Sequence, residues 1–538
     1  MLDLEPTDDL ARPAFHDAAT CQQWLGQLQL TNLGLAQATL HRQLEEFNRC
    51  PLPGRDRLEA LEVLRETVAV VQNDFARKLS GKKLPLNDDE LLLLLALNTL
   101  WQSMQNGYLR CLQLAAAGEK YLAGQLPLIC QRSLYYATRP LAEFQRAGYD
   151  PDAATWRRVH TLYAHIEQLG LATEAVSDPR HLAGLATSGQ TLYLSALLLH
   201  RARLLGLTRT QLHVVERWLA QWQEALQLTT RCSVSKNDAP PLALDLNGAS
   251  GLHGLPGARN GEGMRYLAMV PLSKQIRVKT ILLQQGQTPA QADLGDEFDA
   301  RACITLLNRL HACWCEARPE ALADQPRPTA ELLLCQGLER IYAQLARKPF
   351  RPPKDTRQAM QDVQRQIETF GRVLDETGRH ELEELGFVPE VWLVEQDGLV
   401  QGQLLRKTPL GERMSSGQLV SVHAAGQTGA LKLGVVRAAH VTHGGHLYLV
   451  VDYLPGQPQA LTLRGDAQAP LQSGTAPGLL LPALERLHIP PSLLLPRDWF
   501  HAGRELELTL ADQKKQKVRL GFSVGKGLDF ERVSFELL

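Results

Sequence analysis

The spacing of apolar residues divides the chain into a long helical part and a shorter β-rich part. Within the first 230 residues, apolar side chains recur at steps of three and four, for example at Leu58, Leu61, Leu64, Val68, Val71 and Phe75. This spacing predicts amphipathic helices. Across residues 391–464, runs of aliphatic and β-branched residues alternate with turns that contain Gly, Pro or Ser, which is typical of antiparallel strands.

The helical signal is strongest around a run of leucines and one alanine at residues 91–97. Asn87, followed by Glu90 three residues later, forms a capping-box pattern that predicts a helix start just before this run. Because the run is apolar on every side, we expect it to form the central and most buried helix. Further helices are expected at about 120–146, 153–170, 187–205, 207–229, 271–286, 297–317, 337–348 and 356–385. No repeat period is sustained, so the sequence predicts a bundle or an irregular solenoid.

The β-rich part predicts a small antiparallel barrel, with Gly444-Gly445 suited to a tight hairpin. Strands are expected at 331–335, 418–422, 431–437, 446–453, 460–463, 505–510, 517–523 and 532–537. The predicted fold class is therefore α+β and multidomain, an all-α N-terminal region followed by an antiparallel β-barrel. The expected domains are a helical domain at 1–230, a Gly-rich loop with further helices at 231–317, and a barrel domain at 318–538 with a helical insertion at about 337–385.

Composition limits the expected binding partners and cellular location of the protein. Lys and Arg total 57 against 58 for Asp and Glu, a formal net charge of -1, so no overall field attracts nucleic acid or an anionic membrane. Nine cysteines, an odd number scattered through apolar segments, favour reduced thiols and a cytoplasmic protein. The N-terminus shows no signal-peptide pattern, and the longest aliphatic run, 91–97, is too short to span a bilayer.

The search for catalytic and metal-binding motifs leaves several enzyme classes without support. The sequence contains no G-x-S-x-G, H-E-x-x-H, Walker A or paired C-x-x-C motif, which argues against an ordinary hydrolase, kinase or zinc protein. His440, His443 and His446 flank the Gly-Gly turn. Because no carboxylate or cysteine stands nearby, we interpret them as a polar hairpin tip rather than a metal site. We therefore expect no metal and no catalytic residue.

A glycine-rich stretch at residues 247–263 leaves an enzyme hypothesis open. It lacks the Gly-Lys-Ser/Thr ending of a P-loop and the G-x-G-x-x-G frame of a dinucleotide-binding fold, so we interpret it as a flexible surface loop. If this stretch formed an active site instead, the nearest acid–base residues would be Asp245, His253 and Glu262.

Several framework motifs follow one another in a recognisable order. They lie at residues 28–48, 55–68, 82–86, 334–345, 417–422, 433–437 and 479–482, together with Trp392. Their order resembles the long PilZ-like proteins of proteobacteria, in which an all-helical region precedes a modified PilZ barrel. The resemblance covers most of the chain and implies a PilZ-like barrel in its C-terminal part. It also makes cyclic di-GMP the ligand to consider.

In PilZ domains, cyclic di-GMP is held by an R-x-x-x-R stretch and a D-x-S-x-x-G stretch, which supply guanidinium groups for the phosphates and polar groups for guanine. Here Arg327 matches the second arginine of the first stretch, but Ala323 occupies the position of the other. Asp397 and Gly402 match the second stretch, with Leu399 at the serine position. Each hydrogen bond missing from a buried guanine edge costs roughly 1–3 kcal/mol, which argues against standard cyclic di-GMP binding.

One further R-x-x-x-R, from Arg347 to Arg351, is a fallback source of phosphate ligands, although basic residues at a helix C-terminus also have a purely structural use. We therefore expect a non-enzymatic regulatory scaffold in cyclic di-GMP-linked signalling, which acts through protein partners of its helical region. The alternative is a genuine cyclic di-GMP receptor that uses these non-standard arginines. A second alternative is an enzyme with a site near residues 247–263.

Overall fold

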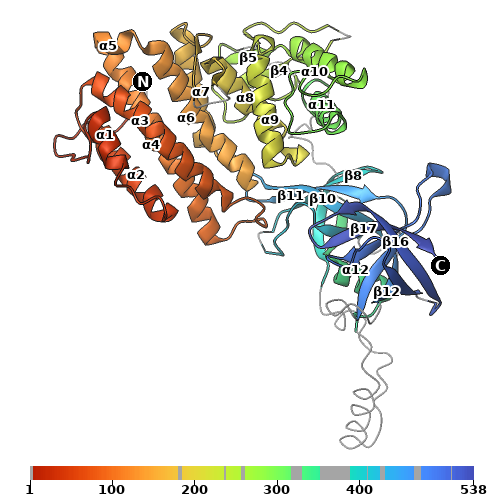
Figure 1. Ribbon diagram of the computed structural model, residues 1–538. Coiled ribbons are helices and arrows are strands. Elements are labelled where there is room, and N and C mark those ends of the chain that lie inside the picture. Colours follow the sequence, from red (N-terminus) through yellow and green to blue (C-terminus); the bar gives the residue numbers. More distant parts are fainter. Residues whose placement is uncertain are drawn as a thin grey trace, which may run out of the picture. The chain divides into compact units, whose positions relative to one another are not determined.

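The chain forms two compact units (Figure 1). The helical unit comprises Met1–Lys82 and Leu86–Pro326, and the β unit comprises Lys83–Pro85 and Arg327–Leu538. In Figure 1 the helical unit runs from red to green and the β unit ends in blue. The computed structural model describes residues 4–179, 184–235, 238–255, 261–316, 330–351, 388–408, 410–424, 431–465, 474–510 and 512–538.

The helical unit follows the predicted order of helices, several of which end earlier than expected. Among the described residues, its α-helices are α1 (Ala18–Leu25), α2 (Leu33–Arg49), α3 (Gly54–Arg77), α4 (Asp88–Ala116), the single turn α5 (Lys120–Ala123), α6 (Leu126–Ala147), α7 (Ala153–Gln168), α8 (Gly189–Arg201), α9 (Arg209–Gln221), α10 (Met269–Gln284) and α11 (Ala300–Trp314). Small antiparallel sheets accompany them, formed by β1 (Ala175–Val176), β2 (Thr187–Ser188), β3 (Leu228–Thr229), β4 (Leu242–Asp245) and β5 (Met264–Leu267).

Helix α4 packs against α2, α3 and α6, and its start confirms the predicted capping box. The Asn87 side chain accepts a hydrogen bond from the Glu90 backbone N–H at 2.9 Å, and the Glu90 carboxylate accepts one from the Asn87 N–H at 3.0 Å. The expectation that the leucine run is the most buried segment is wrong, because Leu92 and Leu95 are 63% and 56% exposed. Leu97 at the end of the run is fully buried, as is Met104 further along the helix.

A buried ion network ties the loop after β1 to the bundle. Asp178 is 1% exposed and pairs with Arg65 and, at 3.1 Å, with Arg132. Glu62 accepts hydrogen bonds from Arg132 Nε at 3.1 Å and from the Tyr108 hydroxyl at 2.6 Å. Burial raises the pKa of Glu62, but the charges of Arg132 and Arg65 outweigh it and hold that pKa below its usual range. The opposite charges of this network therefore balance inside the bundle.

The described part of the glycine-rich stretch, residues 247–255, is a partly exposed loop, as expected, and it is held by hydrogen bonds to its neighbours. Ala243 and His253 exchange backbone hydrogen bonds of 2.8 and 3.0 Å. The His160 Nε2 atom lies 2.9 Å from the Ser250 carbonyl oxygen, and Gly251 is buried. Burial lowers the pKa of His160, which keeps its imidazole neutral. Residues 256–260 lie outside the described residues.

Within its described residues, the β unit contains two closed six-stranded antiparallel barrels. The first barrel has the order β10-β11-β8-β7-β6-β9, with β6 (Glu331–Gln336), β7 (Glu390–Asp397), β8 (Gln401–Arg406), β9 (Leu419–Ala424), β10 (Lys432–Val441) and β11 (Leu447–Leu454). The second barrel has the order β12-β13-β14-β17-β16-β15, with β12 (Gln459–Gly465), β13 (Thr475–Leu481), β14 (Ser492–Pro496), β15 (Glu505–Leu510), β16 (Lys515–Lys526) and β17 (Phe530–Leu537).

The predicted change from helices to an antiparallel barrel is confirmed, but the sequence indicated one barrel where the structure has two. The difference comes from β12, which follows β11 after a short turn and yet pairs with β13 and β15. Both β11 and β12 carry the apolar residues expected of a strand, so the sequence does not reveal the change of barrel. Strands β7, β8, β13 and β14 were not expected individually, because a short apolar run between turn residues does not by itself settle the type of element.

Helix α12 (Leu338–Ala346) packs between the two barrels. Its Ile341 and Tyr342 share a buried cluster with Leu419 of the first barrel and with Leu479 of the second. The Tyr342 hydroxyl also lies 3.4 Å from Thr462 Oγ1 on β12. The first and second barrels are therefore joined by a common core. The helix lies at the start of the predicted helical insertion, whose residues 352–387 are outside the described residues.

Candidate ligand-binding site at the mouth of the first barrel

Asp397 and Gly402 match the second PilZ stretch, and they pair with each other across the β7–β8 hairpin. Asp397 ends β7, and its Oδ2 atom accepts a hydrogen bond from Lys432 Nζ at 2.8 Å. Lys432 begins β10, which is not a neighbour of β7 in the barrel, so this ion pair spans the end of the barrel. We call this end the barrel mouth and define it by Asp397, Gly402, Lys432 and Tyr453.

Tyr453 of β11 occupies the barrel mouth from inside. It is 8% exposed, and Lys432 Nζ lies 4.8 Å from the centroid of its ring. The ring has room because glycines stand beside it: a Cβ atom at Gly402 would collide with the Tyr453 hydroxyl, and one at Gly434 would lie 3.2 Å from ring Cδ1. Burial, followed by the negative charge of Asp397, raises the pKa of the Tyr453 hydroxyl, so the phenol stays protonated.

Polar side chains continue from the barrel mouth onto the outer surface. Asp452 accepts hydrogen bonds from Gln401 at 3.1 Å and from Arg437 Nε at 2.7 Å. Leu399, which occupies the serine position of the PilZ stretch, is 97% exposed at the hairpin tip, and the adjacent Val400 is 73% exposed. The tip therefore presents apolar surface where the family pattern has a hydroxyl group.

Arg347 comes close to the same end of the barrel through helix α12. It ends this helix in a left-handed backbone conformation, with φ 53°. Gln344, three residues earlier, lies 3.1 Å from His423 Nδ1 on β9. The neighbouring residue of β9, Val422, pairs with Lys432. The C-terminal end of α12 therefore lies at the end of the barrel that carries Lys432.

The other two candidate arginines are placed less fully. Arg351 is exposed and follows the end of α12. Arg327 lies outside the described residues. Ala330, three positions after it, accepts a hydrogen bond from the Val394 backbone N–H at 3.0 Å, and Val394 lies three positions before Asp397. The described neighbours of the candidate arginines therefore lie near the strand end that carries Asp397.

A second polar group lies inside the first barrel. Arg406 is 2% exposed and donates Nη1 to the Glu390 carboxylate at 2.7 Å and to the Glu412 carbonyl oxygen at 2.9 Å. Its guanidinium carbon lies 5.2 Å from the ring centroid of Trp392. Among the described residues, the Nε and Nη2 atoms of Arg406 have no hydrogen-bond partner. This interior therefore holds a cation that is only partly satisfied.

Lys432, Tyr453 and Arg406 were not predicted as site residues from the sequence. Lys432 and Tyr453 are single residues in strands that alternation predicts, whereas Arg406 lies in β8, which was not expected as a separate strand. A single residue has no characteristic spacing. To place Lys432 beside Asp397, one would need the complete order of the barrel strands, since β7 and β10 are not neighbours.

The residues named for other sites lie in turns or near the ends of strands, with His440 in β10 and Asp245 at the end of β4. His443 is exposed, and the His446 Nδ1 atom lies 3.3 Å from the Lys407 carbonyl oxygen. Within the described part of the chain, no group of three or more His, Cys, Asp or Glu residues could hold a metal ion. Asp245 Oδ1 accepts a hydrogen bond from its neighbour Asn247 at 2.9 Å, and Glu262 is exposed. His253 pairs with Ala243 through its backbone.

Comparison with known proteins gives family matches for an N-terminal and a C-terminal segment of the chain. Residues 19–233 match the family model described as the N-terminal domain of the cyclic-di-GMP receptor FimW. Residues 466–538 match the model described as the FimW C-terminal beta-barrel domain. The chain carries both domains of the FimW family. A curated relative, the cyclic-di-GMP receptor FimW of Pseudomonas aeruginosa, is 23% identical over 582 residues, which cover 99% of this chain and 93% of the relative. No solved structure matches the chain.

The FimW matches confirm the order of a helical N-terminal region and a C-terminal β-barrel. The C-terminal match spans β13 to β17 of the second barrel, and the first barrel lies between the two matched segments. The resemblance of residues 318–538 to PilZ-like proteins therefore stays a prediction. Across the described residues, the structure contains no helix with the length and apolar character needed to cross a membrane.

Proposed function

We propose that this FimW-family protein is a non-catalytic receptor for cyclic di-GMP and that the ligand binds at the mouth of the first barrel. The choice of ligand is supported by the family name and by the Pseudomonas aeruginosa receptor, which aligns with nearly the whole chain. The location rests on Asp397 and Gly402, which the β7–β8 hairpin holds beside Lys432. We therefore favour the receptor, which was the alternative in the sequence analysis, over a scaffold that binds no ligand.

The barrel mouth offers the groups that the ligand requires. Cyclic di-GMP carries two phosphate anions and two guanine bases. The Lys432 side chain is 41% exposed, so its ammonium group can turn from Asp397 toward a phosphate. The Asp397 carboxylate is then free to accept hydrogen bonds from the N–H groups of a guanine edge. Further guanidinium groups would come from Arg347 and Arg351 after α12 and from Arg327 before β6.

Leu399 sets the expected affinity. It stands where the family pattern has a serine, and its exposed aliphatic side chain cannot form the hydrogen bond of a hydroxyl group. The loss of one such bond costs about 1 kcal/mol, or roughly a factor of five to ten in affinity. We therefore propose a receptor of roughly micromolar rather than nanomolar affinity.

The helical unit keeps its expected role in this proposal. Receptor function requires that ligand binding is passed to a partner, and we propose that the helical unit provides the surface for protein partners. The second alternative, an enzyme with Asp245, His253 and Glu262 at its site, gains no support, since these residues form part of a turn and its paired strands.

Isothermal titration calorimetry of cyclic di-GMP into the full chain tests the proposal. We expect Lys432→Ala and Asp397→Ala each to weaken binding about tenfold or more, because each removes a charged hydrogen-bond partner. Arg327→Ala and Arg347→Ala are expected to act in the same direction. The matched control is Lys515→Ala, which removes an exposed ion pair of similar length, 3.0 Å to Glu507, from the second barrel.

The outcomes separate the ligand from the location. If no heat is observed up to about millimolar cyclic di-GMP, the chain is not a receptor for this ligand. If the ligand binds and the affinity is unchanged in Lys432→Ala and Asp397→Ala, the receptor function stands but the barrel mouth is the wrong site.

A further inference from the structure

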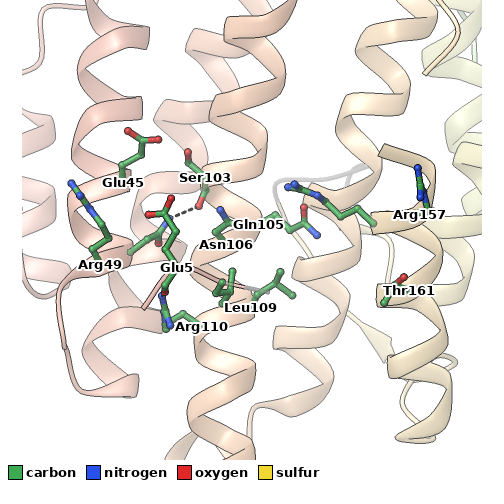
Figure 2. Close-up of a pocket in the computed structure, with 13 residues that line it drawn as sticks. Glu5, Glu45, Arg49, Ser103, Gln105, Asn106, Leu109, Arg110, Arg157 and Thr161 are labelled. Carbon is green, nitrogen blue, oxygen red and sulfur yellow. Dashed lines mark hydrogen bonds between the residues drawn. The ribbon is translucent and has the colours of Figure 1, made fainter. Parts of the chain in front are cut away.

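The helical unit contains a cavity of about 480 Å³ between α2, α4 and α7. Figure 2 shows Arg49 on one side of it, Arg157 and Thr161 on the other, and Gln105 and Asn106 between them. We call it the helical pocket. All of its lining residues belong to the helical unit. Its volume falls in the range of roughly 300–1,000 Å³ that is typical of small-molecule sites.

The lining of the helical pocket is positively charged, although the chain as a whole is not. Its arginines come from three helices and are Arg49 of α2, Arg110 of α4, and Arg157 and Arg158 of α7. The carboxylates of its lining are Glu5 and Glu45. Cations therefore exceed anions at this cavity in a chain whose formal net charge is -1. Guanidinium groups gathered in one cavity are the usual means of binding phosphate.

The arginines of α2 and α4 each have a hydrogen-bond donor without a partner among the described residues. Arg49 is paired with Glu46, and Arg110 Nη1 donates to Gln113 at 3.1 Å. Nevertheless, the Nε atoms of Arg49 and Arg110 are buried and have no partner among the described residues. Each side chain is thus held in position by its other nitrogens and still has a donor to offer.

Gln105 gives an independent indication of a ligand. It is 1% exposed, and among the described residues neither its Oε1 nor its Nε2 atom has a hydrogen-bond partner. Asn48 beside it donates Nδ2 to the Ser103 carbonyl oxygen at 2.8 Å, but its own Oδ1 atom is buried without a partner in the same part of the chain. Buried amides in folded proteins nearly always find partners. Leucine or methionine would fill this position of α4 at lower cost.

We propose that the helical pocket binds a nucleoside phosphate, with its phosphate at the arginines and its base edge at Gln105. A carboxamide presents one donor and one acceptor side by side, which matches the donor–acceptor edge of a nucleobase. The arginines of three helices surround the phosphate, so binding would also hold α2, α4 and α7 together. This site is separate from the barrel mouth, since none of its residues belongs to the β unit.

Calorimetric titrations of the full chain with GMP, AMP, inorganic pyrophosphate and cyclic di-GMP test this proposal. We expect at least one of the three nucleotides to bind more tightly than pyrophosphate. Arg158→Gln and Gln105→Leu should each weaken this binding about tenfold. The matched control is Arg42→Gln, which removes an equally charged, exposed arginine of α2 that does not line the cavity.

Thermal unfolding of the same variants separates a ligand contact from a structural role. Gln105→Leu removes a buried amide without a partner, so we expect its melting temperature to be unchanged or higher while its nucleotide affinity falls. If Gln105→Leu lowers the melting temperature and leaves nucleotide affinity unchanged, Gln105 is structural and the proposal is wrong. The proposal is also wrong if no nucleotide binds, or if pyrophosphate binds as tightly as every nucleotide.

Cyclic di-GMP serves to distinguish this site from the proposed receptor site. If its binding depends on Lys432 and not on Arg158, while GMP or AMP depends on Arg158, both sites are supported. If its binding depends on Arg158 and not on Lys432, the helical pocket is supported and the barrel mouth is rejected as the receptor site. Nucleotide binding that is indifferent to Arg158→Gln and Gln105→Leu rejects the helical pocket alone.

Discussion

The two barrels of the β unit close with the same number of strands, six in each among the described residues, but their interiors differ. The second barrel encloses an aliphatic core, in which Leu461, Leu493 and Val533 are at most 1% exposed. The first barrel buries Arg406 deeply and places Tyr453 at its mouth. The second barrel is therefore filled mainly by leucine and valine, whereas the first barrel also buries an arginine, which is costly to bury.

The difference between the two interiors indicates which barrel is the better candidate for ligand binding. The second barrel closes around a mainly aliphatic core, and its buried Glu531 lies near the start of β17. A buried arginine is therefore not needed for closure of a six-stranded barrel in this chain. The Asp397–Lys432 pair and Tyr453 lie at an end of the barrel that solvent reaches. The proposed ligand site therefore lies in the first barrel, and the second barrel shares a core with α12.

The largest expected effect concerns the buried cation of the first barrel. Glu390→Gln leaves Arg406 without its carboxylate partner in a site where the arginine is 2% exposed. We expect a loss of about 4 kcal/mol in the free energy of unfolding, measured by chemical denaturation of the full chain, because an unpaired charge remains buried. The control is Glu507→Gln in the second barrel, whose partner Lys515 is exposed, and its expected loss is under about 1 kcal/mol. Equal losses in the two variants would remove the contrast between the barrels.

The next effect concerns the aliphatic core of the second barrel. Leu463 is fully buried, and Leu463→Ala is expected to cost about 3 kcal/mol of stability because it leaves a cavity. Cyclic di-GMP affinity of the folded variant should equal that of the unmodified chain, as measured by calorimetry well below the unfolding temperature. A clear fall in affinity would show that the second barrel takes part in binding.

A smaller effect is expected for Gly402→Ala at the barrel mouth. The added Cβ atom collides with the Tyr453 hydroxyl, so the ring must move, at a cost of about 2 kcal/mol in stability and with a weaker cyclic di-GMP affinity. Gly525→Ala on β16 is the matched control, because a Cβ atom there meets nothing within 4 Å. Denaturation and calorimetry check both variants, and an unaffected Gly402→Ala chain would mean that Tyr453 is not packed as described.

The smallest effect is a pH dependence at the junction of the two barrels. Asp529, in the turn between β16 and β17, accepts a hydrogen bond from the Leu419 backbone N–H at 2.9 Å. Burial raises the pKa of Asp529, so the folded state favours the protonated form, and this contribution to stability is lost as pH rises through the folded pKa. Asp529→Asn keeps an acceptor oxygen and cannot ionise. Its stability relative to the unmodified chain should rise between pH 4 and pH 7 in urea denaturation, and a falling difference would contradict the assignment.

Local signals in the sequence were sufficient for much of the fold. Asn87 and Glu90 form the predicted cap because both partners lie within one helical turn. The strands from 418 to 463 follow from alternation and glycine turns, which are also local. The number of barrels was not predictable in this way, since β12 differs from β11 only in the distant strands with which it pairs.

The candidate site was predicted in part. Asp397 and Gly402 were found because they stand in one short stretch, whereas Lys432 and Tyr453 reach Asp397 through tertiary structure. The helical pocket had no sequence signal at all, because its arginines belong to three helices that are separated by many residues. A glutamine such as Gln105 is ordinary in a helix, and only its burial without a partner distinguishes it.

Hydrogen exchange of the full chain, measured by mass spectrometry with and without cyclic di-GMP, is the most direct test of ligand binding at the barrel mouth. We expect the ligand to protect β7, β8 and the start of β10, around Asp397, Gly402 and Lys432, and to leave exchange in β15 and β16 of the second barrel unchanged. Protection confined to the second barrel or to α2, α4 and α7, or no protection at millimolar ligand, would contradict cyclic di-GMP binding at the first barrel.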